Sequence, residues 1–227
     1  MKTMTFLFTF FIVAMQGYYS QTYFGSFDLV ATQQYQNGNE RSDTISYFFG
    51  EKKTAIIIHG RRNQPDMRMV FDFDDATITS LFELNGKKGG YILPMNEAYW
   101  PGMPQAIRTF GTEPRTEQNY TGEIKDIEHH SCREVLAESD AYSATLWVAE
   151  DIPLSMTHVL AYQSVGKGKS KKEIELFDQF GVKGLPLHLF LKSKTDKADV
   201  TIHLINISDD FDAVVFSTEG HILSAVD

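Results

Sequence analysis

The feature that most constrains the fold is a repeated alternation of apolar and polar residues with a period of two. Between residues 185 and 191 every second residue is leucine. Between residues 67 and 73 the larger apolar side chains alternate with Arg68, Val70 and Asp72. Successive side chains of a β-strand point to opposite faces of a sheet, so such runs are typical of half-buried strands.

Further segments have strand character, and their connections carry turn residues such as Asn37-Gly38 and Asp74-Asp75. The remaining expected strands are Phe24–Thr32, Asp43–Phe49, Thr54–His59, Ala76–Leu84, Tyr120–Glu128, Ser131–Glu138, Ala144–Ala149 and Val200–Leu204, with a partly extended stretch at Phe211–Asp227. Residues 85–90 are interpreted as a turn. Residues 92–118 lose all periodicity and contain four prolines, which predicts a long loop that is functional or mobile.

Helical patterns are few. Ser170 and Glu173 have the spacing of a capping box, with Ile174, Phe177 and Phe180 on one helical face and a glycine following at 181. A second short helix is expected at residues 155–164. The sequence therefore predicts an α+β fold, namely a curved open antiparallel β-sheet (half-barrel) of about ten strands with one or two helices packed on the concave side.

The first 20 residues have the pattern of a signal peptide. A lysine at position 2 precedes an apolar run at residues 4–15 that is too short to span a bilayer comfortably. We expect cleavage near Ser20, leaving residues 21–227 as a single β-rich domain that is periplasmic or secreted, without a stable transmembrane anchor. An uncleaved N-terminal anchor is the alternative.

The charge balance restricts the partners. The 21 basic residues are outnumbered by 30 acidic ones, and the net charge of −9 repels phosphate backbones and anionic lipid surfaces. We therefore expect no nucleic-acid partner. Cys132 is the only cysteine, which excludes an intramolecular disulfide and also a lipid-modified cysteine after the leader.

Candidate chemistry is sparse. His129, His130 and Cys132 lie close together, but a structural zinc site needs four ligands, and a buried apolar role for the cysteine is the simpler interpretation. A cysteine nucleophile would need a base and a setting that favours the thiolate. The acidic runs at 72–75 and 209–212 lack the spacing of a calcium loop. We predict no catalytic residues, no metal site, no cofactor and no enzyme activity.

The remaining signal is apolar. Methionine and aromatic side chains on the predicted sheet could line a cavity, with the loop at 99–103 acting as a lid, although a simple core explains the same residues. The residues predicted to line a cavity are Met67, Met69, Phe71, Phe73, Trp100, Met103 and Trp147.

Several short motifs resemble the domain of unknown function 4412 family of exported bacterial proteins, common in Bacteroidetes. They are Lys87-Lys88 to Tyr91 with Pro94-Met95, residues 121–127 leading to residues 131–135, the tryptophan-containing stretch 145–153, and Gly184-Leu185-Pro186-Leu187. His129-His130 and the stretch 216–221 depart from the family pattern. The resemblance implies a fold like that of the periplasmic lipoprotein carriers LolA and LolB, an open half-barrel closed by helices around an apolar cavity, and it implies no enzyme activity.

Three functions follow as hypotheses. The first is non-enzymatic binding of a lipid, a lipoprotein acyl chain or another hydrophobic ligand. The second is a cell-envelope protein-protein interaction module, which an exposed apolar patch around Trp100 would favour. The third is an enzyme that uses Cys132 with His129 or His130, and a buried, unreactive Cys132 would exclude it.

Overall fold

A computed structural model describes residues 23–107, 118–195 and 197–226. The expected signal peptide, and part of the expected loop at 92–118, lie outside these residues. The elements in chain order are β1 (Gly25–Gln34), β2 (Glu40–Phe49), β3 (Lys53–Ile58), β4 (Met67–Asp72), β5 (Thr77–Leu84), β6 (Lys87–Pro94), α1 (Met103–Ile107), β7 (Asn119–Ile127), β8 (His130–Glu138), β9 (Tyr142–Ala149), α2 (Met156–Ala161), α3 (Lys172–Phe180), β10 (Leu185–Ser193), β11 (Asp199–Ser208) and β12 (Ile222–Ala225), with 3₁₀ turns at Tyr162–Ser164 and Ala213–Phe216.

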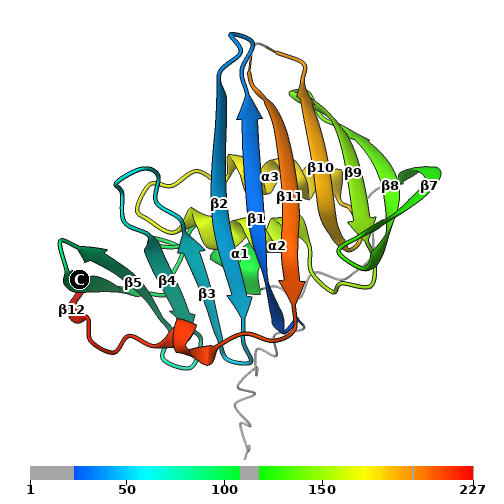
Figure 1. The fold of residues 1–227 in the computed structure, drawn as a ribbon. Coiled ribbons are helices and arrows are strands. Elements are labelled where there is room, and N and C mark those ends of the chain that lie inside the picture. Colours follow the sequence, from blue (N-terminus) through cyan, green and yellow to red (C-terminus); the bar gives the residue numbers. More distant parts are fainter. Residues whose placement is uncertain (1–22, 108–117, 196, 227) are drawn as a thin grey trace, which may run out of the picture.

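All twelve strands of the described residues form one open sheet (Figure 1). Their order is β12-β6-β5-β4-β3-β2-β1-β11-β10-β9-β8-β7. Neighbouring strands are antiparallel except β12, which pairs with β6 in parallel. β1 to β6 therefore form one sequential meander and β7 to β11 another, and the two meanders meet where β1 pairs with β11.

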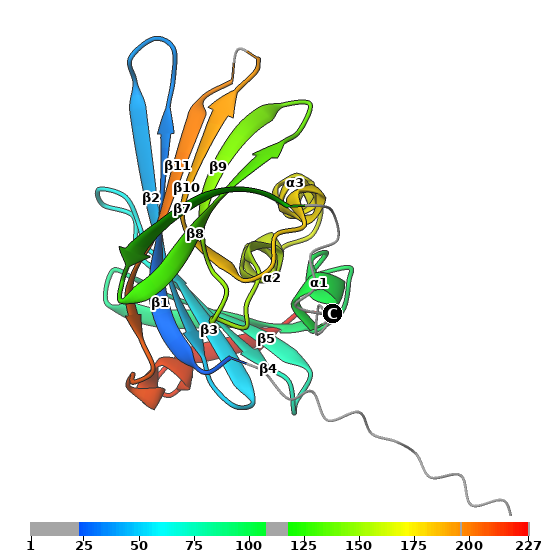
Figure 2. The same cartoon turned by 90° about the vertical axis from the view of Figure 1, so that its right-hand side faces the viewer.

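The sheet curves around α1, α2 and α3, which lie inside its concave side (Figure 2). Alternate residues of the strands point to this side and join the helices in one core, as the period-two pattern predicts. Its largest fully buried members include Phe27, Tyr47, Phe49, Phe71, Trp100, Leu146, Tyr162, Leu185 and Leu187. The concave side is thus largely filled with side chains where the helices cover it.

The C-terminal segment covers part of the convex side. Val215 packs there with Ala55, Val70 and Leu81 in a second, smaller buried cluster. Arg68 of β4 donates from Nη2 to the carbonyl oxygen of Ser217 at 2.8 Å, which fixes this segment across the strands. The segment ends in β12, which pairs with β6 at the edge of the sheet.

The structure confirms the predicted open antiparallel sheet and corrects the counts. The described residues form twelve strands where about ten were expected, and three α-helices where one or two were expected. The turn and loop interpretation of residues 85–94 was wrong, because Lys87–Pro94 forms β6. Gly90 weakened the strand signal, yet glycine is required there, since a Cβ would lie 2.5 Å from the carbonyl oxygen of Ser80 and 2.9 Å from Cδ2 of Leu223.

The predicted start of α2 and the predicted end of α3 agree with the structure. The capping box predicted for α3 was wrong, because the N-cap is Lys171 without a side-chain hydrogen bond, and Oγ of Ser170 accepts from the backbone N–H of Lys172. Ser155 caps α2 by accepting a hydrogen bond from the backbone N–H of His158. Gly181 ends α3 in the left-handed conformation, and Ile174, Phe177 and Phe180 are its buried face. Within the described ranges no helix is long and apolar enough to cross a membrane.

Candidate functional site

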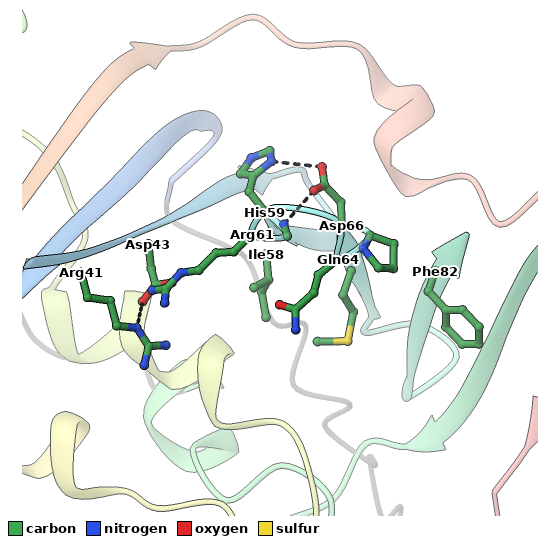
Figure 3. Close-up of a pocket in the computed structure, with 11 residues that line it drawn as sticks. Arg41, Asp43, Ile58, His59, Arg61, Gln64, Asp66 and Phe82 are labelled. Atoms are coloured by element: carbon green, nitrogen blue, oxygen red, sulfur yellow. Dashed lines mark hydrogen bonds and ion pairs between the residues drawn. The ribbon is translucent and has the colours of Figure 1, made fainter. Parts of the chain in front are cut away.

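A pocket of about 720 Å³ lies beside β2, β3, β4 and β5. Its lining residues come from these four strands and from the β3–β4 loop, residues 59–66 (Figure 3). They are Arg41, Asp43, Ile58, His59, Gly60, Arg61, Gln64, Pro65, Asp66, Met67 and Phe82. The volume lies within the range of about 300–1,000 Å³ that is common for small-molecule sites.

The floor of the pocket is an apolar row across three neighbouring strands. Ile58 of β3 is paired with Met67 of β4, and Met67 is paired with Phe82 of β5. These residues continue the alternation that places Ile56, Met69 and Ile78 in the core, so they point to the same side of the sheet. Met67 is 38% exposed. The row is therefore an apolar surface that the fold leaves open.

The β3–β4 loop that forms the wall of the pocket is tightly closed. The carboxylate of Asp66 accepts hydrogen bonds from the backbone N–H of Gly60 at 2.8 Å and from Nδ1 of His59 at 3.1 Å. A Cβ at Gly60 would lie 2.0 Å from the carbonyl oxygen of Gln64, so only glycine fits this turn. The loop is thereby held in a shape that presents Arg61 and Gln64 to the pocket.

Two arginines share one carboxylate at the end of the pocket opposite Phe82 (Figure 3). Nε of Arg41 lies 3.2 Å from Oδ2 of Asp43, and Nη2 of Arg61 donates to the other oxygen of the same carboxylate. Nε of Arg61 is buried and makes no hydrogen bond with any residue that the structure describes. The guanidinium groups therefore offer more donors here than Asp43 can satisfy.

His59 points to the other side of the β3 ribbon from Ile58 and Gln64 (Figure 3). Its Nε2 lies 2.8 Å from Oγ of Ser46, which lies 2.5 Å from Oδ1 of Asp28. The order Ser46–His59–Asp66 has the connectivity of a catalytic triad. Ser46, however, is only 7% exposed, lies against the Asp28 carboxylate and does not line the pocket, so the chain of hydrogen bonds ties the loop to the sheet.

The seven residues predicted to line a cavity lie in different parts of the structure. Met67 lies in the pocket. Met69, Phe71 and Trp100 are buried in the core, and Phe73 and Met103 are partly buried against it. Trp147 alternates with the buried Leu146 and Val148 and lies under the ammonium group of Lys125, 5.7 Å from its ring centre. A ligand contact by any of the seven stays a prediction.

Sequence reasoning missed the other residues of the pocket. Arg41 and Asp43 come from β2, and Phe82 comes from β5, so their proximity depends on strand register that no local pattern reveals. One local signal was present. Gly60 and Pro65 bracket Arg61 and Arg62 between two predicted strands, which marks a basic loop.

The structure gives Cys132 no setting that favours a thiolate. The residue is fully buried, and its Sγ donates to the backbone carbonyl of His130. Burial and the nearby carboxylate of Asp151 raise the pKa of this thiol to about 11. The His130 ring pairs instead with Asp151 at 2.8 Å, and His129 lies in the β7–β8 turn.

No family model matches the chain, and no curated protein matches it in sequence. The resemblance to the domain of unknown function 4412 family therefore stays a prediction. The chain is similar to solved structures at low identity. One is the structure of PNGF-II in the C2 space group, with a TM-score of 0.38 and 10% identity over 88% of this chain and 31% of that chain.

Two further structures complete the comparison. PNGF-II in the P21 space group gives a TM-score of 0.41 and 11% identity over 89% of this chain and 32% of that chain. The LolA superfamily protein NE2245 from Nitrosomonas europaea gives a TM-score of 0.34 and 7% identity over 86% of this chain and 90% of that chain. The chain thus spans about a third of the PNGF-II chains and most of the length of the LolA superfamily protein.

Proposed function

We propose that this chain is an exported, non-enzymatic binding protein that holds a hydrophobic ligand in the pocket between β2 and β5. The observation that carries the proposal is the row Ile58–Met67–Phe82, which lies open in a pocket of about 720 Å³. An apolar surface that water wets in the free protein is a source of binding energy when a ligand covers it.

The rest of the concave side supports the same location. Around Trp100 the helices and strands fill the space, and the Trp100 indole N–H donates to the carbonyl oxygen of Ala161 at 2.8 Å. A ligand there would have to displace buried side chains. In the pocket near Met67 it would displace only water.

An exposed apolar patch around Trp100 would have favoured the alternative of an interaction module. That residue is 0% exposed, so the structure offers no such patch at this position.

Export is part of the proposal and rests on the apolar leader at residues 4–15. The N-terminal residue of the protein purified from its native host, read by mass spectrometry, tests the signal peptide. A start near residue 21 supports export with cleavage, and an intact residue 1 contradicts cleavage.

Binding is tested with Nile red, an uncharged dye that fluoresces when it enters apolar surroundings. We expect saturable fluorescence with the wild-type protein and roughly tenfold weaker binding with Met67→Asp, because a carboxylate on the pocket floor must be desolvated. The matched control is Ile124→Asp on β7, which is 65% exposed and lies outside the pocket. Equal binding by both variants, or no binding by the wild type, would contradict the proposal.

A further inference from the structure

We propose that the ligand is an amphiphile with an anionic head group, a carboxylate or a phosphate ester, that binds Arg41 and Arg61. This inference rests on the proposed function and adds the chemistry of the head group to it. The apolar row takes the tail. The first argument is the charge of the pocket within an acidic chain of net charge −9.

The charged residues that line the pocket are two arginines and two aspartates, namely Arg41, Arg61, Asp43 and Asp66. The carboxylate of Asp66 is already bonded to the Gly60 N–H and to His59. This leaves two guanidinium groups facing one carboxylate, that of Asp43. The end of the pocket near Arg41 and Arg61 is therefore short of negative charge.

The second argument is the unpaired donor. Nε of Arg61 is buried and has no acceptor among the residues the structure describes. A buried polar group without a partner destabilises the folded protein, so the present position of the Arg61 side chain carries a cost. An acceptor in the pocket would remove this cost if the guanidinium turned towards it. Guanidinium groups present parallel N–H donors that match the two oxygens of a carboxylate or a phosphate.

The third argument is the arrangement of the two ends. Figure 3 shows Arg41, Asp43 and Arg61 at one end of the pocket and Phe82 at the other, with Ile58 between them. A polar end and an apolar end in one pocket match a molecule with a head and a tail. Asp43 occupies the position of a head-group carboxylate in the free protein, so an incoming anion competes with it for the same donors.

The inference is tested by isothermal titration calorimetry with four probes of equal chain length, kept below their micelle concentrations. These are dodecanoate, dodecyl phosphate, dodecan-1-ol and dodecyltrimethylammonium. We expect the wild-type protein to bind the two anions about tenfold or more tightly than the alcohol, and the cation most weakly. Acetate and inorganic phosphate test the head group alone, and we expect both to bind much more weakly than the amphiphiles.

Variants show which residues produce the preference for an anionic head group. Arg61→Gln and Arg41→Gln should lose the preference for dodecanoate over dodecan-1-ol, whereas Arg62→Gln, in the same loop but outside the pocket lining, should keep it. Asp43→Asn should bind dodecanoate more tightly than the wild type, because it removes the competing carboxylate. Circular dichroism confirms that each variant is folded.

The outcomes separate the two proposals. Equal affinity for dodecanoate and dodecan-1-ol would overturn the anionic head group and leave the hydrophobic pocket standing. Binding of neither amphiphile, together with no binding of Nile red, would overturn the proposed function itself. Acetate or inorganic phosphate that binds as tightly as the amphiphiles would show a simple anion site and overturn the role of the tail.

Discussion

The ring of Trp100 lies against the ring of Phe71, with their centres 4.7 Å apart. This contact joins the segment that follows β6 to the C-terminal end of β4. Tyr162 stands edge-on to Phe71 with ring centres 4.8 Å apart, so the three rings connect the sheet to α1 and α2. The stretch at 99–103, predicted as a mobile lid, is in fact anchored by Trp100 in the core, since a fully buried indole cannot move without opening a cavity.

Trp100→Ala should lower the free energy of unfolding by about 3–5 kcal/mol, because it leaves a large cavity and removes the hydrogen bond from the indole N–H to the Ala161 carbonyl. Urea denaturation followed by circular dichroism measures the change. The control is Tyr91→Ala, at a position that is 50% exposed, where we expect a loss below about 1 kcal/mol. A similar loss in both variants would show that the indole does not hold the core together.

Gly60→Ala should disrupt the pocket, because the new Cβ would lie 2.0 Å from the carbonyl oxygen of Gln64 and the β3–β4 loop would have to move. We expect roughly tenfold weaker Nile red binding. Asn63→Ala, an exposed change in the same loop, should leave binding unchanged. Wild-type affinity in Gly60→Ala would mean that the shape of this loop does not define the site.

His158 makes the stability of the protein depend on pH. Burial lowers the pKa of this histidine from 6.5 to about 4, and its Nε2 is buried without a hydrogen-bond partner among the described residues. The unfolded chain takes up a proton at His158 as the pH falls below about 6.5, but the folded chain resists until about 4. The contribution of this histidine to the free energy of unfolding is therefore complete above pH 6.5 and is lost as the pH falls through this window.

His158→Phe should remove this dependence. Between pH 7 and pH 4.5 the wild-type protein should lose about 2–3 kcal/mol more than the variant, as follows from about 1.4 kcal/mol per pKa unit. Urea denaturation at the two pH values gives the difference. His129→Gln, in the exposed β7–β8 turn, is the control and should follow the wild type. Parallel pH profiles of wild type and His158→Phe would contradict the prediction.

Cys132 should be unreactive in the folded protein. Its thiol is fully buried and its pKa is raised to about 11 by burial, so thiolate is scarce at neutral pH. We expect reaction with Ellman's reagent at pH 7.5 to be at least about 100-fold slower than in 6 M guanidinium chloride, where the thiol is exposed and its pKa returns towards about 8.5. Fast reaction without denaturant would contradict this prediction and support the hypothesis that Cys132 is a nucleophile.

The sequence predicted the sheet where the alternation was strong. The leucines at 185–191 and the run at 67–73 gave β10 and β4 almost to the residue. Prediction failed where glycine was required by close contacts between strands. Gly90 lies under Leu223 of β12, and no local pattern shows that residues more than a hundred positions apart will pair.

The pocket was less predictable than the fold. Met67 was selected because it shares one face of the predicted strand with Met69 and Phe71. The same pattern could not show that Met67 is open whereas Met69 and Phe71 are buried. What distinguishes them is how far the packed core extends along β4, which is a tertiary property. The arginine pair was missed because Arg41 and Arg61 meet only through the β2–β3 register and the shape of the β3–β4 loop.

The pairing of β1 with β11 has a consequence for how the chain folds. β1 to β6 can form from neighbouring hairpins, and in the other meander only β9 and β10 are joined by a longer segment, which carries α2 and α3. The seam, in contrast, joins Gln34 to Asp199 and Ser26 to Ser208, far apart along the chain. Bringing such distant segments together is entropically the slowest kind of contact to make. The two halves of the sheet should therefore become ordered before they join. Until the seam closes, β1 and β11 are two exposed strand edges able to pair with the wrong molecule, which makes this interval the period when the protein is most prone to aggregate.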